Sequence, residues 1–346
     1  MQPIVKLLDN ILSRLFMVAI TTVALTSCDG MIYDDEGDCA PYYKVKFRYD
    51  MNMKFADAFP NEVNSVTLYA VDAATGRVVW QNHESGERLK ADGYEMDLPV
   101  DPGRYHLMAW CGDGHRTSFT VNDAEHIDDL HCRLNRDYET RAGQDNGAVS
   151  TTDLGRLYHG RENNLEMPAE QGTHYYNVNL TKNTNVIRVI LQQLTGEKLD
   201  KDAFDFEITD VNGHLESDNS LRDDELITYR PWHVDNAVSN IIYGDYAPAA
   251  DKRAVLAELT VSRLMLDGNP RLTVKKHDNG DVIFSVPLKP YCLAFKGEHY
   301  AGMDDQEFLD REDSYNMVFF LDEGMRWMNA YIYINSFKVV LQDVEL

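Results

Sequence analysis

Apolar and polar residues alternate along most of the chain after residue 43. Val45, Phe47 and Tyr49 are separated by Lys46 and Arg48, and a period of two is the pattern of a half-buried β-strand. Similar short runs recur at 66–70, 78–80, 94–98, 105–109, 119–121, 186–191, 204–208, 255–266, 272–274, 282–286, 317–321, 329–334 and 337–346. Only 197–203 and 303–312 carry a helical pattern, and both are short. The sequence therefore predicts an all-β protein.

Turns containing Asp, Asn and Gly separate these runs in both halves of the chain. Asp72–Gly76 is one example, and the Asn-Gly pair at 212–213 is a hairpin signal. A chain of 346 residues holds about two domains, and short strands with regular turns favour sandwiches over a parallel sheet. We predict one β-sandwich at 43–172 and a second at 173–346. The polar stretch 135–173 should hold the last strand of the first and the connection.

The N-terminus has the features of a secretory signal. Lys6 and Arg14 are basic, and 15–25 is an apolar run too short to span a bilayer. The run ends in Leu-Thr-Ser before Cys28, which resembles a lipobox, where the cysteine becomes acylated and forms the new N-terminus. Each buried acyl CH₂ contributes ~0.8 kcal/mol, so two or three chains give stable attachment. We predict a lipoprotein signal peptide at 1–27, an acidic tether at 28–42, and a surface-exposed protein anchored by lipid in the outer membrane.

The charge balance excludes one class of partner. The chain has 33 Lys and Arg against 57 Asp and Glu, a formal net charge of −24. A field of this sign repels phosphate backbones, so nucleic acid is not an expected partner.

Motifs of catalysis and cofactor binding are missing from the sequence. There is no Gly-rich phosphate loop, no GxSxG elbow and no HExxH, so we predict that the protein is not an enzyme and carries no cofactor. The nearest approaches to a metal site are His126 with His131 and Cys132, and the acidic run 304–313. Neither has the spacing of a zinc or EF-hand site, and no metal is predicted. The four tryptophans could stack on sugars, but three lie beside apolar strand runs, which favours core packing.

Five cysteines occur, at positions 28, 39, 111, 132 and 292. With Cys28 acylated, four remain in an oxidising compartment, and four cysteines allow three pairings. Sequence does not choose among them. We favour a disulfide between Cys39 and Cys132, since both flank strand runs of the first half.

The order of these motifs resembles the FimB/Mfa-like fimbrial anchor lipoproteins along nearly the whole chain. The N-terminal block is the most specific part, because it combines Cys28 with an acidic segment and the run 46–59. Other segments that fit the pattern are 32–35, 38–39, 66–69, 109–110, 153–160, 183–185 with Val189, and 339–344.

The resemblance implies two transthyretin-like β-sandwich domains and a place at the base of a type V pilus. There a lipidated subunit holds the fibre on the cell and limits its length. Related stalk subunits lose an N-terminal strand to an arginine-specific protease, and the groove accepts a neighbour's strand by β-augmentation. Residues 28–43 contain no Lys or Arg, and 51–63 contain Lys54 but no Arg. This composition favours an anchor or terminal subunit over a stalk subunit.

The implied partner is a fimbrillin stalk subunit bound through β-strand contact. Our candidate contact is the C-terminal strand 337–346, with Phe337, Val339, Leu341 and Val344 on its apolar pattern. Two alternatives stay open: a tip or adhesin subunit of the same pilus, and a surface glycan-binding lipoprotein with exposed, clustered aromatic residues. A secreted hydrolase on a β scaffold would need paired carboxylates in a cleft.

Overall fold

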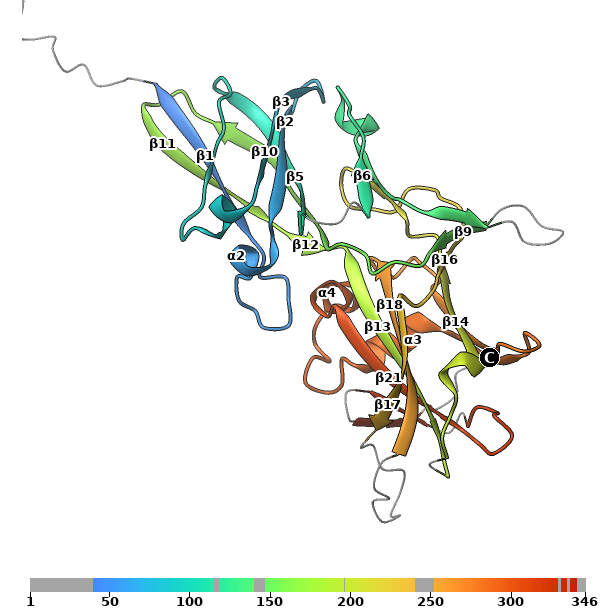
Figure 1. Ribbon diagram of the computed structural model, residues 1–346. Helices are drawn as coiled ribbons and strands as arrows, with labels where there is room; N and C mark the ends of the chain where they lie inside the picture. Colours follow the sequence, from blue (N-terminus) through green and yellow to red (C-terminus); the bar gives the residue numbers. More distant parts are fainter. Residues whose placement is uncertain are drawn as a thin grey trace, which may run out of the picture.

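The computed structural model describes residues 40–114, 118–139, 147–195, 197–239, 252–328, 331–334 and 337–340. Across these ranges the chain is mostly β-structure, arranged in five sheets. Figure 1 shows two halves: β1, β2, β3, β5, β10 and β11 gather in one, and β13, β14, β17, β18 and β21 in the other. The predicted all-β class is confirmed at this level.

Two sheets pack face to face in the first half. One has the strand order β11-β1-β4, with bounds Gly172–Asn179, Pro41–Arg48 and Met96–Asp97. The other has the order β12-β10-β5-β2-β3, with bounds Thr181–Lys182, Leu157–Met167, Gly103–Gly112, Ser65–Asp72 and Val78–Ser85. Val45 and Phe47 of β1 meet Leu68 of β2 and Leu107 of β5 in one core. The alternation read from the sequence therefore places the correct residues inside.

A third sheet covers the outer face of the five-stranded one. Its order is β15-β7-β6, with bounds His214–Glu216, His131–Leu134 and Phe119–Val121. Tyr69, Met108 and Trp110 of the inner sheet pack there against Leu130 and Leu215. Covering on both faces explains why β5 is apolar without interruption from residue 107 to 111, since both sets of alternating side chains are buried.

The second half contains two six-stranded sheets around the largest core. One has the order β17-β18-β13-β21-β22-β23, with bounds His233–Ser239, Lys252–Ser262, Thr184–Gln193, Ser314–Leu321, Tyr331–Ile334 and Phe337–Val340. The other has the order β20-β19-β14-β16-β9-β8, with bounds Val282–Pro287, Arg271–Lys276, Phe204–Asp210, Ile227–Tyr229, Gly147–Ser150 and Asp137–Glu139. Val189, Leu259 and Phe319 meet Phe206 and Val274 between them.

Helices are short and lie outside the sheets. Among the described residues, the α-helices are α2 (Phe59–Glu62), α3 (Leu288–Ala294) and α4 (Asp305–Arg311), and the 3₁₀ turns are η1 (Glu87–Lys90), η2 (Ile127–Asp129) and η3 (Lys201–Ala203). The expected helix at 303–312 is confirmed as α4, capped by the Asp304 carboxylate. The pattern at 197–203 yields only the η3 turn. Sequence reasoning missed α3, where Pro290 is tolerated because first-turn N–H groups have no helical partner. None of the helices in the described ranges is long and apolar enough to cross a bilayer.

The segment 135–173 contributes strands to sheets of both halves, whereas the sequence predicted one strand and a connection. It contributes β8 and β9 to a sheet of the second half, then β10 to the first, where β11 pairs in parallel with β1. Its polar composition hid β10, because Arg161 to Leu165 are at least partly exposed around a bulge. The division of the chain at residues 172 and 173 stays a prediction. The strand order crosses it, because β8 and β9 join a sheet of the second half and β11 joins a sheet of the first.

Candidate partner-contact edges and the junction between the halves

β1 occupies the middle of its sheet. It pairs in parallel with β11 from Pro41↔Gly172 to Arg48↔Asn179, and antiparallel with β4 at Lys44 and Val45. Val45 is 0% exposed, and Tyr43, Phe47 and Tyr49 are also buried. The Tyr43 hydroxyl donates to the Pro168 carbonyl at 2.6 Å. The first described strand therefore completes its own sheet and fills the space between the two layers.

The basic residues of β1 face outward and have partners. Lys44 Nζ lies 2.5 Å from Glu95 and 3.2 Å from Asp97, and Arg48 lies 2.9 Å from Asp50. Lys46 Nζ sits 4.5 Å from the centroid of the Tyr175 ring on β11. Pairs of this kind at the surface contribute only ~0–1 kcal/mol each. The burial of the apolar face, and not these pairs, holds β1 in place.

β23 contrasts with β1 because it ends a sheet. It pairs with β22 from Tyr331↔Val340 to Ile334↔Phe337, and within the described part of the chain no other strand lies beyond it. Phe337 and Val339 of the candidate contact strand belong to β23, whereas Leu341 and Val344 lie outside the described residues. An edge strand presents unpaired N–H and C=O groups to another chain. Its role as a contact stays a prediction.

The predicted lipidation and disulfide positions are only partly visible. Cys28 and Cys39 lie outside the described residues. Cys132 lies in β7 and is buried, and burial raises the pKa of its thiol. Cys111, Cys132 and Cys292, the three cysteines that the structure describes, form no disulfide with one another. The pairing of Cys39 with Cys132 stays a prediction.

Buried amides lie at the start of β13, where the chain enters the second half. The Asn183 and Asn219 side chains exchange two hydrogen bonds, of 2.6 and 3.1 Å. The Asn185 amide donates to the Glu312 carbonyl at 3.2 Å and accepts from the Leu264 N–H at 3.3 Å. These asparagines belong to the segment 183–185 that contributed to the family resemblance. Their role in the structure is to satisfy buried backbone and amide groups, which would otherwise cost stability.

The segment 153–160, also part of the resemblance, makes contacts of the same kind. The Thr260 hydroxyl donates to the Asp153 carboxylate at 2.9 Å. His159 Nε2 lies 3.0 Å from the Ser217 carbonyl, and burial lowers the pKa of this imidazole to about 3. His159 is therefore neutral at physiological pH. Both residues connect segments of the chain, and Asp153 also lines a hollow beside Arg136.

A loop of the first half rests on α4 of the second. Arg311 donates to the Asp50 carbonyl at 2.9 Å, and its guanidinium lies 4.6 Å from the centroid of the Phe55 ring. Lys182 forms an ion pair with Asp313 and lies 3.6 Å from Glu62. The two halves thus meet through side chains, in addition to the strands β8 and β9 that the chain places in a sheet of the second half before it returns to the first.

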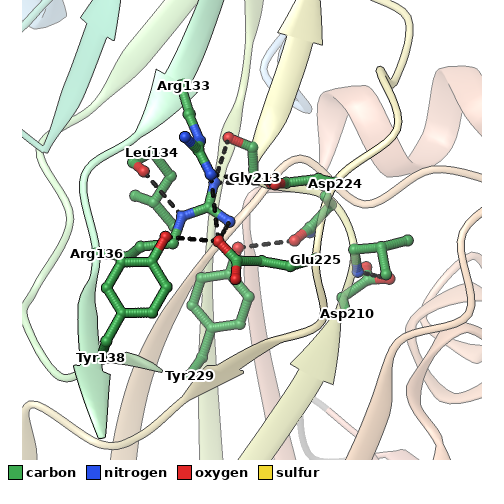
Figure 2. Close-up of polar contacts among 11 residues, drawn as sticks. Arg133, Leu134, Arg136, Tyr138, Asp210, Gly213, Asp224, Glu225 and Tyr229 are labelled. Atoms are coloured by element: carbon green, nitrogen blue, oxygen red, sulfur yellow. Dashed lines mark hydrogen bonds and ion pairs between the residues drawn. The ribbon is translucent and has the colours of Figure 1, made fainter. Parts of the chain in front are cut away.

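A buried polar cluster surrounds Arg136, between β7 and β8 (Figure 2). Its guanidinium lies 2.7 Å from Asp224, and both side chains are almost fully buried. The same group donates to the Leu134 and Gly213 carbonyls at 3.1 and 3.3 Å. Glu225 lies 3.4 Å from it and accepts from the Tyr138 hydroxyl at 2.6 Å. Figure 2 shows these groups turned toward one another, so the cluster fastens the β7–β8 connection to the loop before β16.

Asp210 lies beside this cluster with one oxygen unsatisfied. Its Oδ1 accepts from the Val211 N–H at 2.9 Å. Its Oδ2 is buried and finds no hydrogen-bond partner among the described residues. Burial raises the pKa of this carboxyl to about 6. A lone buried carboxyl is weak evidence for catalysis, and no group of three or more His, Cys, Asp or Glu in the described ranges could hold a metal ion.

The tryptophans follow the expectation of core packing. Trp110 is buried, and Trp80 and Trp327 pack partly buried against the cores. Trp232 is 39% exposed. Tyr42 and Tyr175 are exposed on the outer face of neighbouring strands, two residues apart in register.

Comparisons with known proteins agree on one family. A model of the fimbrillin-A-associated anchor proteins Mfa1 and Mfa2 matches residues 35–343. A Bacteroides thetaiotaomicron protein described as a candidate adhesin is 32% identical, with a TM-score of 0.76 over 89% of this chain and 100% of that one. A second protein of that species, described as a candidate polysaccharide-binding protein, is 29% identical, with a TM-score of 0.73 over 88% and 99%.

The fimbrial anchor protein Mfa2 of Porphyromonas gingivalis shares the fold at 16% identity, with a TM-score of 0.64 over 87% of this chain and 99% of that one. No curated protein matches the chain. The match to the family model covers well over half of the chain and confirms the resemblance read from the sequence. The chain belongs to the Mfa2 family of fimbrillin-A-associated anchor proteins and is not an enzyme.

Proposed function

We propose that this protein fixes a type V pilus to the outer membrane and limits the length of the fibre. In this proposal residues 1–27 are removed, Cys28 is acylated, and the opposite end of the molecule contacts a fimbrillin stalk subunit. The observation that carries the proposal is the position of β1, which lies in the middle of its sheet with its apolar face buried. The chain's own strand fills the middle position of this sheet, so no donor strand from a neighbour is needed there.

The geometry of the N-terminus supports attachment at one end of the molecule. Twelve residues separate Cys28 from Pro41, so the start of β1 lies within about 45 Å of an acylated Cys28 even when the chain is fully extended. Figure 1 shows the start of β1 at the end of the first half that is remote from β17 and β21. A protein held this way directs its second half away from the bilayer.

The second half offers the edge that a stalk subunit needs. Among the described strands β23 ends its sheet, and it forms the first part of the run 337–346 that the sequence predicted as a contact. Pairing of a fimbrillin strand with this edge is β-augmentation, in which main-chain hydrogen bonds supply affinity. We further propose that each half is a transthyretin-like sandwich, which the paired sheets on either side of one core in each half support.

Two alternatives are weaker. A tip or adhesin subunit would also keep β1, and one relative is described as a candidate adhesin. It would not need acylation at Cys28. A glycan-binding role is suggested by the description of another relative. It does not explain why β1 is kept in the middle of its sheet, because sugar binding does not depend on pairing with a stalk subunit.

The test replaces Cys28 with Ala in the native host and compares cell-bound with shed fimbriae. Ser27→Ala is the matched control, because it keeps a small residue before the cysteine. We expect Cys28→Ala to release most fibres into the medium and to lengthen them, while Ser27→Ala changes nothing. Fibres that stay attached at normal length, with the Cys28→Ala protein present at normal amounts, would contradict an anchor role.

A further inference from the structure

The order of the strands determines how a pulling force crosses the molecule. β11 ends at Asn179, and only four residues separate it from Thr184, where β13 begins. β13 is paired on both sides, with β18 and with β21. Figure 1 shows the chain running from β11 through β12 into β13. A force on the second half therefore reaches β11 through covalent bonds.

The start of β1 is the other end of this path. β1 begins at Pro41, after the segment that joins it to Cys28. That this segment pulls on β1 rests on the proposed anchor role. The residues that pair between β1 and β11 are more than a hundred positions apart in the chain. The direct connection between the two strands is therefore their non-covalent pairing.

The parallel direction of the two strands determines how this pairing is loaded. Pro41 lies beside Gly172, and Arg48 lies beside Asn179. The membrane end pulls on the start of β1, and the second half pulls on the end of β11. The strands are therefore pulled in opposite directions along their own axes. Because the hydrogen bonds of a parallel pair are evenly spaced, such a force stretches all of them together, whereas a force across one end breaks them one after another.

The pairing runs along the whole of β1. Its eight residues span about 26 Å at ~3.3 Å per residue. The Arg48 carbonyl accepts from the Leu180 N–H at 2.8 Å, directly after the end of β11. Main-chain groups two residues apart on a strand point to the same side, so those of Lys46 also point toward β11. On the opposite side β4 pairs with β1 only at Lys44 and Val45.

Side chains on both faces of the pair also oppose sliding. The Tyr43 ring centroid lies 5.8 Å from that of His174 and 6.3 Å from that of Tyr176. On the outer face Lys46 lies over the Tyr175 ring. A slip of one residue would turn Val45, which is completely buried, out of the core. A small slip therefore gives no relief, and the strands have to separate as a unit.

We propose that the parallel pair of β1 and β11 is the joint that carries tension between the membrane end of the molecule and its second half. The joint resists force along the strands and yields to force across them. The strand that fills the middle of the first sheet thus has a second role, which is to transmit the pull of the fibre to the tether.

The test pulls on single molecules of the full mature chain in optical tweezers. Handles are attached through azide-bearing amino acids at two of the exposed positions 40, 171 and 177. Handles at 40 and 177 pull along the strands. Handles at 40 and 171 pull across them, because these residues lie one position before the pair Pro41↔Gly172. At the same constant force we expect rupture along the strands to be more than about tenfold slower, since several hydrogen bonds have to break together.

Two variants of one residue test whether the hydrogen bonds themselves hold the joint. Lys46→Pro removes an N–H that points toward β11, whereas Lys46→Ala removes the same outward side chain and keeps the N–H. With handles at 40 and 177 we expect Lys46→Pro to rupture roughly tenfold faster than Lys46→Ala. If Lys46→Pro does not fold, the comparison of the two directions decides alone, because it leaves Lys46 unchanged.

Two results overturn the proposal: equal rupture rates in the two directions, or equal rates for folded Lys46→Pro and Lys46→Ala along the strands. The purified chain needs neither acyl chains nor fimbrillin for this measurement. A direction-dependent joint in a protein whose Cys28→Ala variant still holds fibres at normal length would therefore contradict the anchor role alone. Equal rates in a protein whose Cys28→Ala variant sheds fibres would contradict only the role of the joint.

Discussion

The first and the last described strands of this chain are placed in opposite ways. β1 lies in the middle of its sheet, paired on both sides, with Val45 completely buried. β23 pairs only with β22 among the strands that the structure describes. The first described strand is therefore enclosed by its neighbours, whereas the last lies at an edge of its sheet.

This difference gives the molecule a direction. A sheet whose middle strand is already present has no gap for a neighbour's strand to fill, whereas an edge strand can accept one. If Cys28 is the membrane end, the closed half faces the cell and the open edge faces the fibre. The variants below change the closed end, the junction and the open end in turn.

The largest effect is expected at the closed end. Val45→Asp places a carboxylate without a partner between the two sheets, and the cost of several kcal/mol is comparable to the whole stability of a domain, ~5–15 kcal/mol. We expect the first half to be unfolded at 25 °C, as measured by limited proteolysis and circular dichroism. Lys46→Asp on the outer face of the same strand is the control and should fold. Equal behaviour of the two variants would mean that β1 does not complete the sheet.

The second effect concerns the junction. Arg136→Ala leaves the Asp224 carboxylate buried without its partner, and such losses cost about 3–5 kcal/mol. Arg133→Ala is the matched control, because Arg133 contacts the same Glu225 at 3.2 Å from a half-exposed position, where a pair contributes less than about 1 kcal/mol. Urea unfolding of both variants measures the difference. Similar midpoints would show that the buried pair in Figure 2 does not hold the β7–β8 connection to the loop before β16.

The third variant, Asp210→Asn, should raise the free energy of unfolding in a pH-dependent way. The pKa of Asp210 rises from 3.8 to about 6 on folding, so the folded state binds this proton more tightly than the unfolded state. The contribution of Asp210 to stability therefore falls as pH rises from about 4 to about 6 and stays low above that. Asp210→Asn should be more stable than the parent at pH 8, by about 3 kcal/mol, and no more stable at pH 4.

Thermal unfolding at the two pH values checks this sign. Asp278→Asn, in an exposed turn, serves as control and should follow the parent at both. An Asp210→Asn variant that is less stable than the parent at pH 8 would contradict the account of an unsatisfied buried carboxylate.

The smallest effect on stability is expected at the open end. Truncation before Phe337 removes β23 and leaves β22 as the new edge, so we expect a loss of only about 1–2 kcal/mol. Binding of fimbrillin should be lost, as measured by co-purification from detergent-solubilised membranes. Normal co-purification with a truncated protein that still folds would exclude 337–346 as the contact strand.

The sequence allowed much of the fold to be predicted, because period-two alternation reports burial directly. Val45, Val66 and Leu107 were all assigned to the interior from this pattern alone, and the structure confirms their burial. The parallel pairs were not predictable in the same way. β1 with β11, and β13 with β21, join residues more than a hundred positions apart, and alternation carries no information about which distant strand is the neighbour.

Polar residues of the junction escaped prediction for a related reason. Arg136 and Asp224 are 88 residues apart, and in a sequence with 57 acidic residues nothing distinguishes the one that becomes buried. Asn183 and Asn185 were noted only as part of a family pattern, and their contacts supply the physical reason for it. Trp110 was assigned to the core, correctly, but its unsatisfied N–H depends on neighbouring strands that only the fold brings together.

The most direct test of the account is the N-terminus of the mature protein. Intact-mass spectrometry of the protein purified from outer membranes detects the acyl chains. Peptide mass spectrometry of the same protein shows whether the residues of β1 are present. The account predicts a chain that starts at Cys28, carries two or three acyl chains and retains residues 41–48. A mature chain that starts after Arg48, without acyl chains, would mean that β1 is removed and that the protein is a stalk subunit instead of an anchor.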